Sequence, residues 1–253
     1  MILVFGGTTE GKQAIEVLDA LQLQYIYSTK TAIKVELGKN GLYRSGAFSV
    51  ESLEQFISDK KITAIIHASH PFAEELHRTI DVVAKRCELP VYRLQRAYPE
   101  RIESSMIYYV QNYEDSLKVL NEKFKGKILL GLTGVQTIEK FENFWENNLS
   151  YFRILDRPSS KDIALKSGFP ENQLILGYPN TSVEAEVELF QQKKIAVVIT
   201  KESGNSGALS VKIDAAKQCN IPIIIIKKPK LPTSFQLVNN KSTLSEILKT
   251  TVQ

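Results

Sequence analysis

The stretch Ile2-Leu3-Val4-Phe5-Gly6-Gly7-Thr8-Thr9-Glu10-Gly11 joins a short apolar run to a turn rich in glycine and threonine. Such a run is typical of a strand covered on both faces of a sheet. A helix is expected to begin near Lys12, and its first N–H groups and positive dipole end would attract a phosphate. The spacing Gly6-x-Thr8-x-x-Gly11 matches the dinucleotide-binding fingerprint at its first and third positions. The stretch therefore predicts a phosphate-binding βα turn, and a tight turn without a ligand is the alternative.

Strand-like and helix-like segments alternate along most of the chain. The strand-like segments are 2–5, 25–27, 64–66, 128–132, 195–199 and 221–226. The helix-like segments include 11–21, 50–58, 71–87, 183–192 and 208–219. This alternation predicts right-handed crossovers in parallel sheets. We predict an α/β fold of two Rossmann-like, doubly wound domains with mostly parallel sheets and a ligand cleft between the domains.

The alternation pauses between Gln95 and Asn112, a segment that contains Pro99 and charged residues and shows no helical period. A second series begins near Gly126. We therefore expect residues 1–98 to form an N-terminal, dinucleotide-binding Rossmann-like domain and residues 99–253 a C-terminal Rossmann-like domain. The end of the chain, residues 233–253, is predicted to add a short strand and a closing helix.

Composition excludes several classes of protein. The 253 residues are 43% hydrophobic and 24% charged, which is typical of a globular chain rather than a disordered one. The formal net charge is +4, and the basic residues show no stripe of the kind that is typical of nucleic-acid binding. The small positive excess is compatible with an anionic ligand. Cys87 and Cys219 are too far apart in sequence to suggest a disulfide framework. No leader or membrane span is recognisable, so a soluble, cytoplasmic protein is expected.

About 20 residues after the first turn, an NAD-binding domain usually carries an acidic residue for the ribose hydroxyls. This chain instead has Tyr27-Ser28-Thr29-Lys30-Thr31. Hydroxyl groups and a lysine would favour a 2′-phosphate, so the segment predicts NADPH over NADH. A solvated turn without a ligand is the alternative.

Two further loops follow strand-like runs in the second half. Thr200-Lys201-Glu202-Ser203-Gly204-Asn205-Ser206-Gly207 precedes a helix, and Leu132-Thr133-Gly134-Val135 follows residues 128–132. Loops at the carboxyl ends of strands face the ligand crevice of open α/β sheets. We therefore predict that both loops bind ligand.

The three histidines lie close together in sequence, at positions 67, 70 and 77. His70 and His77 are two helical turns apart, whereas two ligands of one metal are best placed at i and i+4. No metal site is predicted. His70 precedes Pro71, which suits the first turn of a helix at the edge of the crevice. His77 is expected to pack or lie on the helix surface.

An ordered set of motifs spans nearly the whole chain: Gly6-Gly7-Thr8-Thr9-Glu10, Ala68-Ser69-His70-Pro71-Phe72-Ala73, Arg93-x-x-Arg96, Thr200-Lys201-Glu202-Ser203-Gly204, Lys212-Ile213-Asp214-Ala215-Ala216 and Ile221-Pro222. This set resembles the precorrin-6A reductase family of cobalamin biosynthesis, including its cobalt-precorrin branch. Three positions depart from that pattern: His67 stands where the family usually has an acid, Ala97-Tyr98 replaces a proline after Arg96, and Glu202 replaces a small polar residue. These departures affect local hydrogen bonding and cofactor preference.

The resemblance implies a nicotinamide dinucleotide, NADPH or NADH, bound between the two Rossmann-like domains. It also implies hydride transfer to the C18=C19 bond of a corrin precursor, which gives the dihydro (6B) form. The candidate cofactor-binding residues are Gly6, Gly7, Thr8, Thr9, Glu10, Gly11, Ser28, Thr29, Lys30, Thr133, Gly134, Lys201, Ser203 and Gly204. Arg44, Arg93, Arg96 and Arg153 are candidates for the carboxylates of the macrocycle, because arginine matches carboxylate geometry. His70, Lys201 and Asp214 are candidate proton donors, and Lys201 is also a candidate for binding a phosphate or carboxylate.

Two other functions fit a dinucleotide-binding chain. A short-chain reductase would need a tyrosine with a lysine four positions later, but Arg96 follows Tyr92, Tyr113 follows Tyr109 and Leu117 follows Tyr113 at that spacing. A dinucleotide sensor that closes its domains without chemistry is the remaining alternative. A small corrinoid is the expected partner, with no nucleic acid or membrane, and the oligomeric state is left open.

Overall fold

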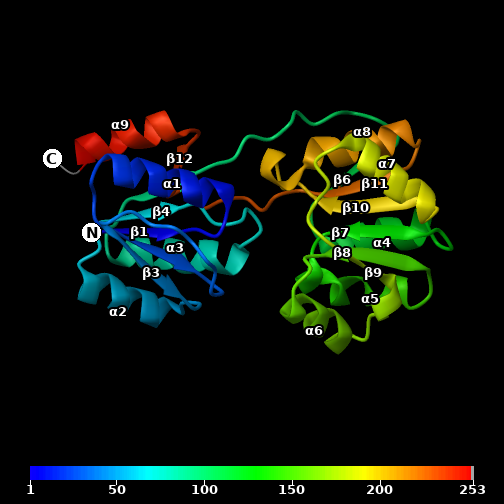
Figure 1. The fold of residues 1–253 in the computed structure, drawn as a ribbon, viewed down its shortest axis with the longest axis horizontal. Coiled ribbons are helices and arrows are strands. Elements are labelled where there is room, and N and C mark those ends of the chain that lie inside the picture. The colour runs from blue at the N-terminus through cyan, green and yellow to red at the C-terminus, as the bar shows by residue number, and fades with distance from the viewer. Residues whose placement is uncertain (252–253) are drawn as a thin grey trace. The chain divides into compact units, whose positions relative to one another are not determined.

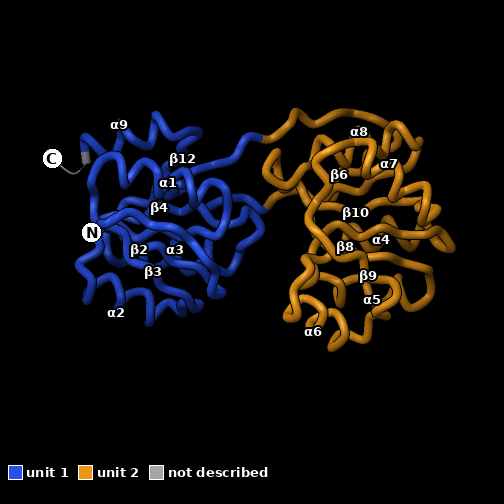
Figure 2. Tube along the Cα trace, in the orientation of Figure 1, with its two compact units in different colours: residues 1–97, 229–253 blue, residues 98–228 orange. Residues whose placement is uncertain are grey.

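In the computed structural model, which describes residues 1–251, the chain forms two compact units (Figures 1 and 2). Unit 1 comprises Met1–Ala97 together with the chain from Pro229 onward, and unit 2 comprises Tyr98–Lys228. Each unit contains one six-stranded sheet. The predicted α/β class with two parallel-sheet domains is confirmed.

Unit 1 is built on a sheet of order β12-β5-β4-β1-β2-β3 in which every pairing is parallel. Its strands are β1 (Ile2–Phe5), β2 (Tyr25–Thr29), β3 (Gly41–Ser45), β4 (Ala64–His67), β5 (Val91–Leu94) and β12 (Gln236–Val238). Its helices are α1 (Thr9–Ala20), α2 (Val50–Lys60), α3 (Glu74–Arg86) and α9 (Lys241–Thr251). Because β1 pairs with β2 on one side and β4 on the other, the chain order reverses at β1.

Unit 2 repeats this plan with the sheet order β6-β11-β10-β7-β8-β9, again parallel throughout. Its strands are β6 (Ile107–Val110), β7 (Leu129–Leu132), β8 (Ser150–Ile154), β9 (Leu174–Leu176), β10 (Val197–Lys201) and β11 (Ile223–Ile226). Its α-helices are α4 (Tyr113–Lys123), α5 (Glu142–Trp145), α6 (Pro158–Lys166), α7 (Val183–Gln192) and α8 (Leu209–Gln218). Short 3₁₀ turns are η1 (Val135–Thr137), η2 (Glu139–Phe141), η3 (Glu171–Gln173) and η4 (Asn205–Gly207). Here β7 is the strand at which the order reverses.

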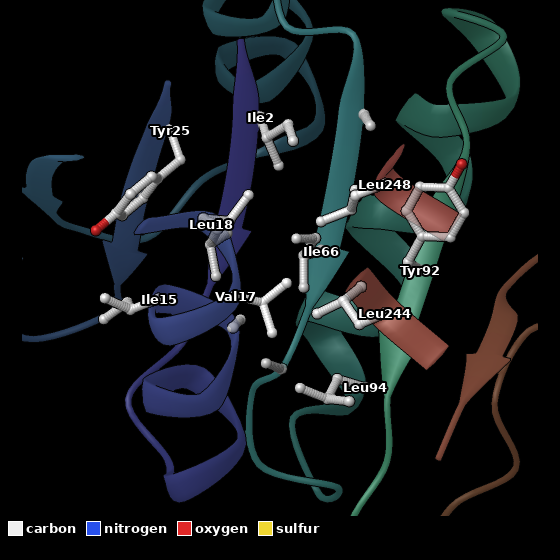
Figure 3. Close-up of a cluster of buried hydrophobic side chains, with 14 of the residues drawn as sticks. Ile2, Ile15, Val17, Leu18, Tyr25, Ile66, Tyr92, Leu94, Leu244 and Leu248 are labelled. Carbon is white, nitrogen blue, oxygen red and sulfur yellow. The ribbon is translucent and has the colours of Figure 1, made fainter. Parts of the chain in front are cut away.

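Alternating residues of the first strand enter opposite core layers of unit 1. Ile2 and Val4 join a cluster with residues of α1 and α9, whereas Leu3 and Phe5 join the cluster on the other face of the sheet. Figure 3 shows the first cluster, in which Leu18 of α1 and Leu244 and Leu248 of α9 are fully buried. This two-sided burial explains why the strand is an uninterrupted apolar run.

The structure corrects the predicted division of the chain after residue 98 in one respect. The segment from Pro229 onward was expected in the C-terminal domain, but it belongs to unit 1. The physical reason is strand pairing: β12 extends the first sheet beside β5, and α9 packs against α1. The expected short strand and closing helix thus exist, but they complete the other sheet.

Some element boundaries also differ from the expectations. Ile107–Val110 lies in the segment expected to interrupt the alternation, yet it forms β6 at the edge of the second sheet. The helix predicted from Pro71 begins only at Glu74, because the chain first makes a turn in which the Ala73 N–H donates to the His70 carbonyl. His70 is therefore in a loop and not in the first helical turn.

Candidate functional site

The predicted cofactor-binding residues and His70 fall into two sets, one at the carboxyl edge of each sheet. In unit 1 they follow β1, β2 and β4, and in unit 2 they follow β7 and β10. Each edge contains the point at which the strand order reverses, where ligands of open α/β sheets bind. The candidate cofactor-binding residues are therefore divided between the units, since Thr133, Gly134, Lys201, Ser203 and Gly204 lie in unit 2.

The glycine turn after β1 is built around the phenol of Tyr27. A Cβ atom at Gly6 or Gly11 would overlap the Tyr27 ring, so both glycines are needed for the ring to lie beneath the turn. The Tyr27 hydroxyl accepts a hydrogen bond from the N–H of Gly7 at 2.8 Å. Gly7 itself has a φ of 89°, a left-handed conformation that favours glycine. Sequence reasoning missed the role of Tyr27, because its position in a buried strand marks it only as core.

Helix α1 begins at Thr9, earlier than the expected start near Lys12, because Thr8 caps it. The Thr8 hydroxyl accepts from the Gly11 N–H at 3.2 Å and donates to the Ala68 carbonyl at 2.6 Å. This second bond ties the turn after β1 to the loop after β4. The helix N-terminus is thereby fixed at the carboxyl edge of the sheet, where its dipole favours an anion.

Glu10, in the first turn of α1, is buried and forms an ion pair with Arg96 at 2.8 Å. The Arg96 side chain is 6% exposed, as is that of Glu10. A buried carboxylate requires such a partner, because an isolated charge is strongly disfavoured away from water. Arg96, predicted as a ligand of the substrate, therefore neutralises a carboxylate within unit 1.

The segment after β2 contains Ser28, Thr29 and Lys30. Ser28 and Thr29 are buried, and the Thr29 hydroxyl donates to the Thr31 carbonyl and bonds to the Tyr43 hydroxyl, each at 2.8 Å. The Lys30 side chain is 77% exposed and lies 4.0 Å from Glu75, an arrangement that contributes little energy.

Arg44 lies on β3, directly opposite Ser28 in the sheet register. Its guanidinium donates to the Ser28 hydroxyl at 2.7 Å and stacks 3.8 Å from the ring centroid of Phe48. Burial lowers the pKa of Arg44 from its ordinary value. Arg44 was predicted as a ligand of the substrate, and the structure brings it to the end of β2, beside the predicted cofactor residues.

The histidine-rich segment after β4 divides into a loop part and a buried part. His70 is half-buried in the loop, and its Nδ1 accepts from the Phe72 N–H at 3.2 Å. A neutral His70 ring therefore carries its proton on Nε2. His77, on α3, packs its ring 4.9 Å from that of His67, so it is a packing residue.

His67 and His77 are held neutral by their surroundings. Burial, with the charge of Arg93 nearby, lowers the pKa of His77 to about 4 and that of His67 well below its usual range. Arg93, another predicted ligand of the substrate, is itself buried and donates to the His67 carbonyl at 3.2 Å. These three side chains form a buried polar layer under the carboxyl edge of the first sheet.

In unit 2, Thr133 and Gly134 follow β7, and Lys201 ends β10. The Thr133 hydroxyl accepts from that of Thr137 at 2.8 Å, and Gly134 has a φ of 87°. A Cβ at Gly134 would lie 4.0 Å from Nζ of Lys201, so this ammonium group lies over the turn after β7. Burial lowers the pKa of Lys201 to about 8.

The loop after β10 is braced by Glu202, one of the departures from the family pattern. Both of its carboxylate oxygens accept from Arg101, at 2.8 and 3.0 Å, and one also accepts from the Lys228 N–H. The next residues, Ser203 and Gly204, are buried. Glu202 thus fixes the loop that carries two predicted ligand-binding residues.

Lys212 of α8 is a buried basic residue that was part of a family-like motif but was not predicted as a site residue. Its Nζ donates to the Gly207 carbonyl at 2.8 Å and lies 3.4 Å from the Thr200 hydroxyl. Burial, reinforced by the charge of Arg153, lowers the pKa of Lys212 to about 7. The signal was present in the sequence, because Leu209, Lys212, Ile213 and Ala216 share the helical spacing of one buried face.

The remaining two candidates in unit 2 differ in exposure. Arg153, on β8, is buried and forms a two-pronged ion pair with Glu186 of α7, at 2.6 and 3.1 Å. Asp214 is exposed on α8, while its neighbours Ile213 and Ala215 are buried. The structure thus places Lys201 at the turn after β7 and Asp214 on the solvent side of its helix.

The described part of the chain was also compared with the requirements of metal sites and membrane-spanning helices. Among residues 1–251, no group of three or more His, Cys, Asp or Glu side chains is arranged to hold a metal ion. Over the same residues, no helix has the length and apolar character needed to cross a bilayer.

Comparison with known proteins identifies relatives along the whole described chain. The family described as Precorrin-6x reductase CbiJ/CobK matches residues 1–251. The cobalt-precorrin-6A reductase of Priestia megaterium is 29% identical over 237 residues, covering 91% of this chain and 91% of the relative. The precorrin-6A reductase of Rhodococcus erythropolis is 26% identical over 242 residues, covering 94% and 93%.

A similar fold is found in a solved structure. It is named CobK precorrin-6A reductase, has a TM-score of 0.80 and 19% sequence identity, and the match covers 99% of this chain and 96% of that one. The two-unit architecture of parallel sheets is therefore common to both chains.

Proposed function

Since this chain belongs to the precorrin-6x reductase family, a family of oxidoreductases, we propose that it reduces precorrin-6A or cobalt-precorrin-6A to the 6B form in cobalamin biosynthesis. The observation that carries this proposal is the match of the family over residues 1–251. Relatives named after each of the two substrates also match, over more than 90% of their own length. The reaction adds a hydride to one carbon of the C18=C19 bond and a proton to the other.

We propose NADPH as the reductant, with NADH as the alternative. The fit rests on unit 1, where a capped helix N-terminus and the turn of Gly7 stand at the carboxyl edge of the sheet. Ser28 occupies the end of β2 where an acidic residue would favour NADH. Bound NADPH would supply the hydride, which is the chemistry of the nicotinamide itself. The contribution of the chain is to hold the dinucleotide through the turn, Thr8 and the α1 N-terminus.

The macrocycle presents carboxylates, and unit 2 supports their binding through positive charge. Lys201, Lys212 and Arg153 are basic residues in or beside the buried layer of this unit, where Arg153 is paired with Glu186. We propose that Lys201 binds an anionic group of the substrate, because its ammonium group lies over the turn of Gly134.

The proton requires a separate donor. His70 carries its proton on Nε2 when neutral, and Lys201, with a pKa of about 8, is largely protonated at pH 7. We propose these two residues ahead of Asp214, whose place on the exposed face of α8 leaves it outside the turns.

The function is tested by incubating the purified protein, without oxygen, with NADPH and either metal-free precorrin-6A or the cobalt form. We expect one equivalent of NADPH to be oxidised for each macrocycle reduced. Absorbance measures the oxidation of NADPH, and mass spectrometry measures the reduced product. Binding of NADPH without oxidation in the presence of both macrocycles would instead indicate a sensor.

A further inference from the structure

We propose that Arg44 is the residue that selects NADPH over NADH, by binding the 2′-phosphate of the adenosine ribose. This inference rests on the proposed function, because it requires a dinucleotide at the carboxyl edge of the first sheet. It reassigns Arg44 from the substrate to the cofactor and leaves Lys30 without the selecting role.

The first argument is placement. Ser28 is paired in register with Phe5, the last residue of β1, and Arg44 is paired in register with Ser28. The guanidinium therefore stands beside the end of β2, next to the strand that carries the glycine turn. In dinucleotide-binding folds an acidic residue at the end of β2 binds the ribose 2′-hydroxyl, and an arginine nearby accommodates a 2′-phosphate.

The second argument is preorganisation. Nη1 of Arg44 donates to the Ser28 hydroxyl at 2.7 Å and Nη2 donates to the Ser45 carbonyl at 3.2 Å. The Phe48 ring centroid lies 3.8 Å from the guanidinium carbon and supports it from one face. A guanidinium has five N–H donors, so three remain after these two bonds. A cation held in one geometry loses little entropy when an anion binds.

The third argument is local charge. Within residues 1–251 no carboxylate lies within ion-pair distance of Arg44, although the side chain is half-buried. A cation in this state gains more from an anionic ligand than one already neutralised. Lys30 is the contrasting case, because it is largely exposed and has Glu75 at 4.0 Å.

Gly46 preserves this arrangement. It has a φ of 117°, and a Cβ there would come within 3.1 Å of Nη2 of Arg44. Its N–H donates to the Thr29 carbonyl, which joins the chain after β3 to the end of β2. The turn at Gly46 therefore keeps the donor side of the guanidinium clear of a side chain.

The experiment measures binding of NADPH and NADH to the full chain by calorimetry, comparing the wild type with Arg44→Gln. Loss of a charge-assisted phosphate contact is expected to weaken NADPH binding about 10- to 100-fold, and NADH binding by less than about twofold. Arg44→Lys keeps the positive charge but loses the planar guanidinium with its paired N–H donors. Its NADPH affinity should therefore lie between those of the wild type and Arg44→Gln. The matched control Lys30→Gln should change both affinities by less than about twofold.

Each outcome decides a different point. Equal losses of NADPH and NADH affinity in Arg44→Gln, or no loss of either, would overturn the assignment. A loss confined to NADPH in Lys30→Gln would transfer the selecting role to that residue. If the wild type binds neither dinucleotide, the proposed cofactor is wrong and the inference fails with it, whereas unchanged NADH binding by Arg44→Gln shows that the variant is folded.

Discussion

In each unit, the strand at which the order reverses, β1 or β7, packs a glycine against an aromatic ring from the neighbouring strand, but the two rings differ in chemistry. In unit 1, Gly6 makes room for Tyr27 of β2, and in unit 2, Gly131 makes room for Phe152 of β8. Only the tyrosine has a hydroxyl, and it holds the N–H of Gly7 in the turn. One packing arrangement therefore occurs in both sheets, and in unit 1 a single oxygen atom links the core to the glycine turn after β1.

The buried charges separate the units further. Unit 1 pairs Glu10 with Arg96 and keeps His67 and His77 neutral, whereas unit 2 buries Lys212 close to the Arg153–Glu186 pair. Two units of the same topology can thus offer different surroundings to anionic ligands. Their stabilities should also respond to pH in different ranges, and hydrogen exchange can follow each unit separately.

The largest expected effect comes from Lys212→Met. The folded pKa of Lys212, about 7, lies below its unfolded value of 10.5, so the unfolded state binds more protons between these values. Lys212 therefore makes wild-type stability rise with pH from about 7 to 10.5, by up to about 1.4 kcal/mol for each pH unit. Lys212→Met should remove this rise, measured by exchange of the α8 amides.

The control is Lys217→Met, since Lys217 is exposed on the same helix. If Lys212→Met and the wild type have the same pH dependence, Lys212 is not a buried, deprotonating group.

Gly6→Ala tests the shared packing. The added Cβ must displace the Tyr27 ring, and forcing atoms into a packed core costs about 1–3 kcal/mol. We expect that loss in the free energy of unfolding of unit 1, measured by urea denaturation, and a similar loss in unit 2 for Gly131→Ala. In a Tyr27→Ala background the loss from Gly6→Ala should shrink, and an undiminished loss would show that the ring is not the obstacle.

Below about pH 6.5, acid should destabilise unit 1 through His77. The pKa of folded His77 is about 4, below its unfolded value of 6.5, so stability falls as pH drops through this window. Between pH 6.5 and 4.5, His77→Phe should remove about 1–2 kcal/mol of the decrease in the free energy of unfolding of unit 1. Hydrogen exchange of the amides of unit 1 measures this change. An unchanged acid response would mean that protonation of His77 does not limit the stability of this unit.

Tyr27→Phe has the smallest expected effect, because it makes the ring of unit 1 resemble Phe152. Loss of the bond to the Gly7 N–H should cost about 0.5–1.5 kcal/mol of unfolding free energy, since water can reach the turn. We also expect weaker NADPH binding in a fluorescence titration, because the turn is held less firmly. Stability and affinity equal to the wild type would show that the hydroxyl has no part in the site.

The sequence was sufficient to predict the class of fold and the loops at the sheet edges. Runs such as Ile2–Phe5 have the apolar character of buried parallel strands, and the glycine turns mark their carboxyl ends. It was not sufficient to predict strand order, because the pairing of β12 with β5 joins residues that are far apart in the chain. Boundaries shifted where a polar cap decided them, as at Thr8.

The sequence predicted where the candidate site residues lie in the fold better than it predicted which residues they contact. Ser28 and Lys30 are two positions apart in sequence, yet the cation that bonds to Ser28 is Arg44, from the neighbouring strand. Likewise, the ion pairs of Arg96 and Arg153 join distant residues and could not be read from a local motif. The roles of these residues in binding remain predictions.

The pairing of β12 with β5 has a consequence for synthesis of the protein. Residues 1–97 leave the ribosome before β12 and α9 have been made, so the growing chain has β5 as an open sheet edge and α1 without its packing partner. Unit 2 is translated in full during this interval. Unit 1 must therefore remain incomplete until β12 and α9 have been translated, and until then its open β5 edge is a surface prone to wrong pairing.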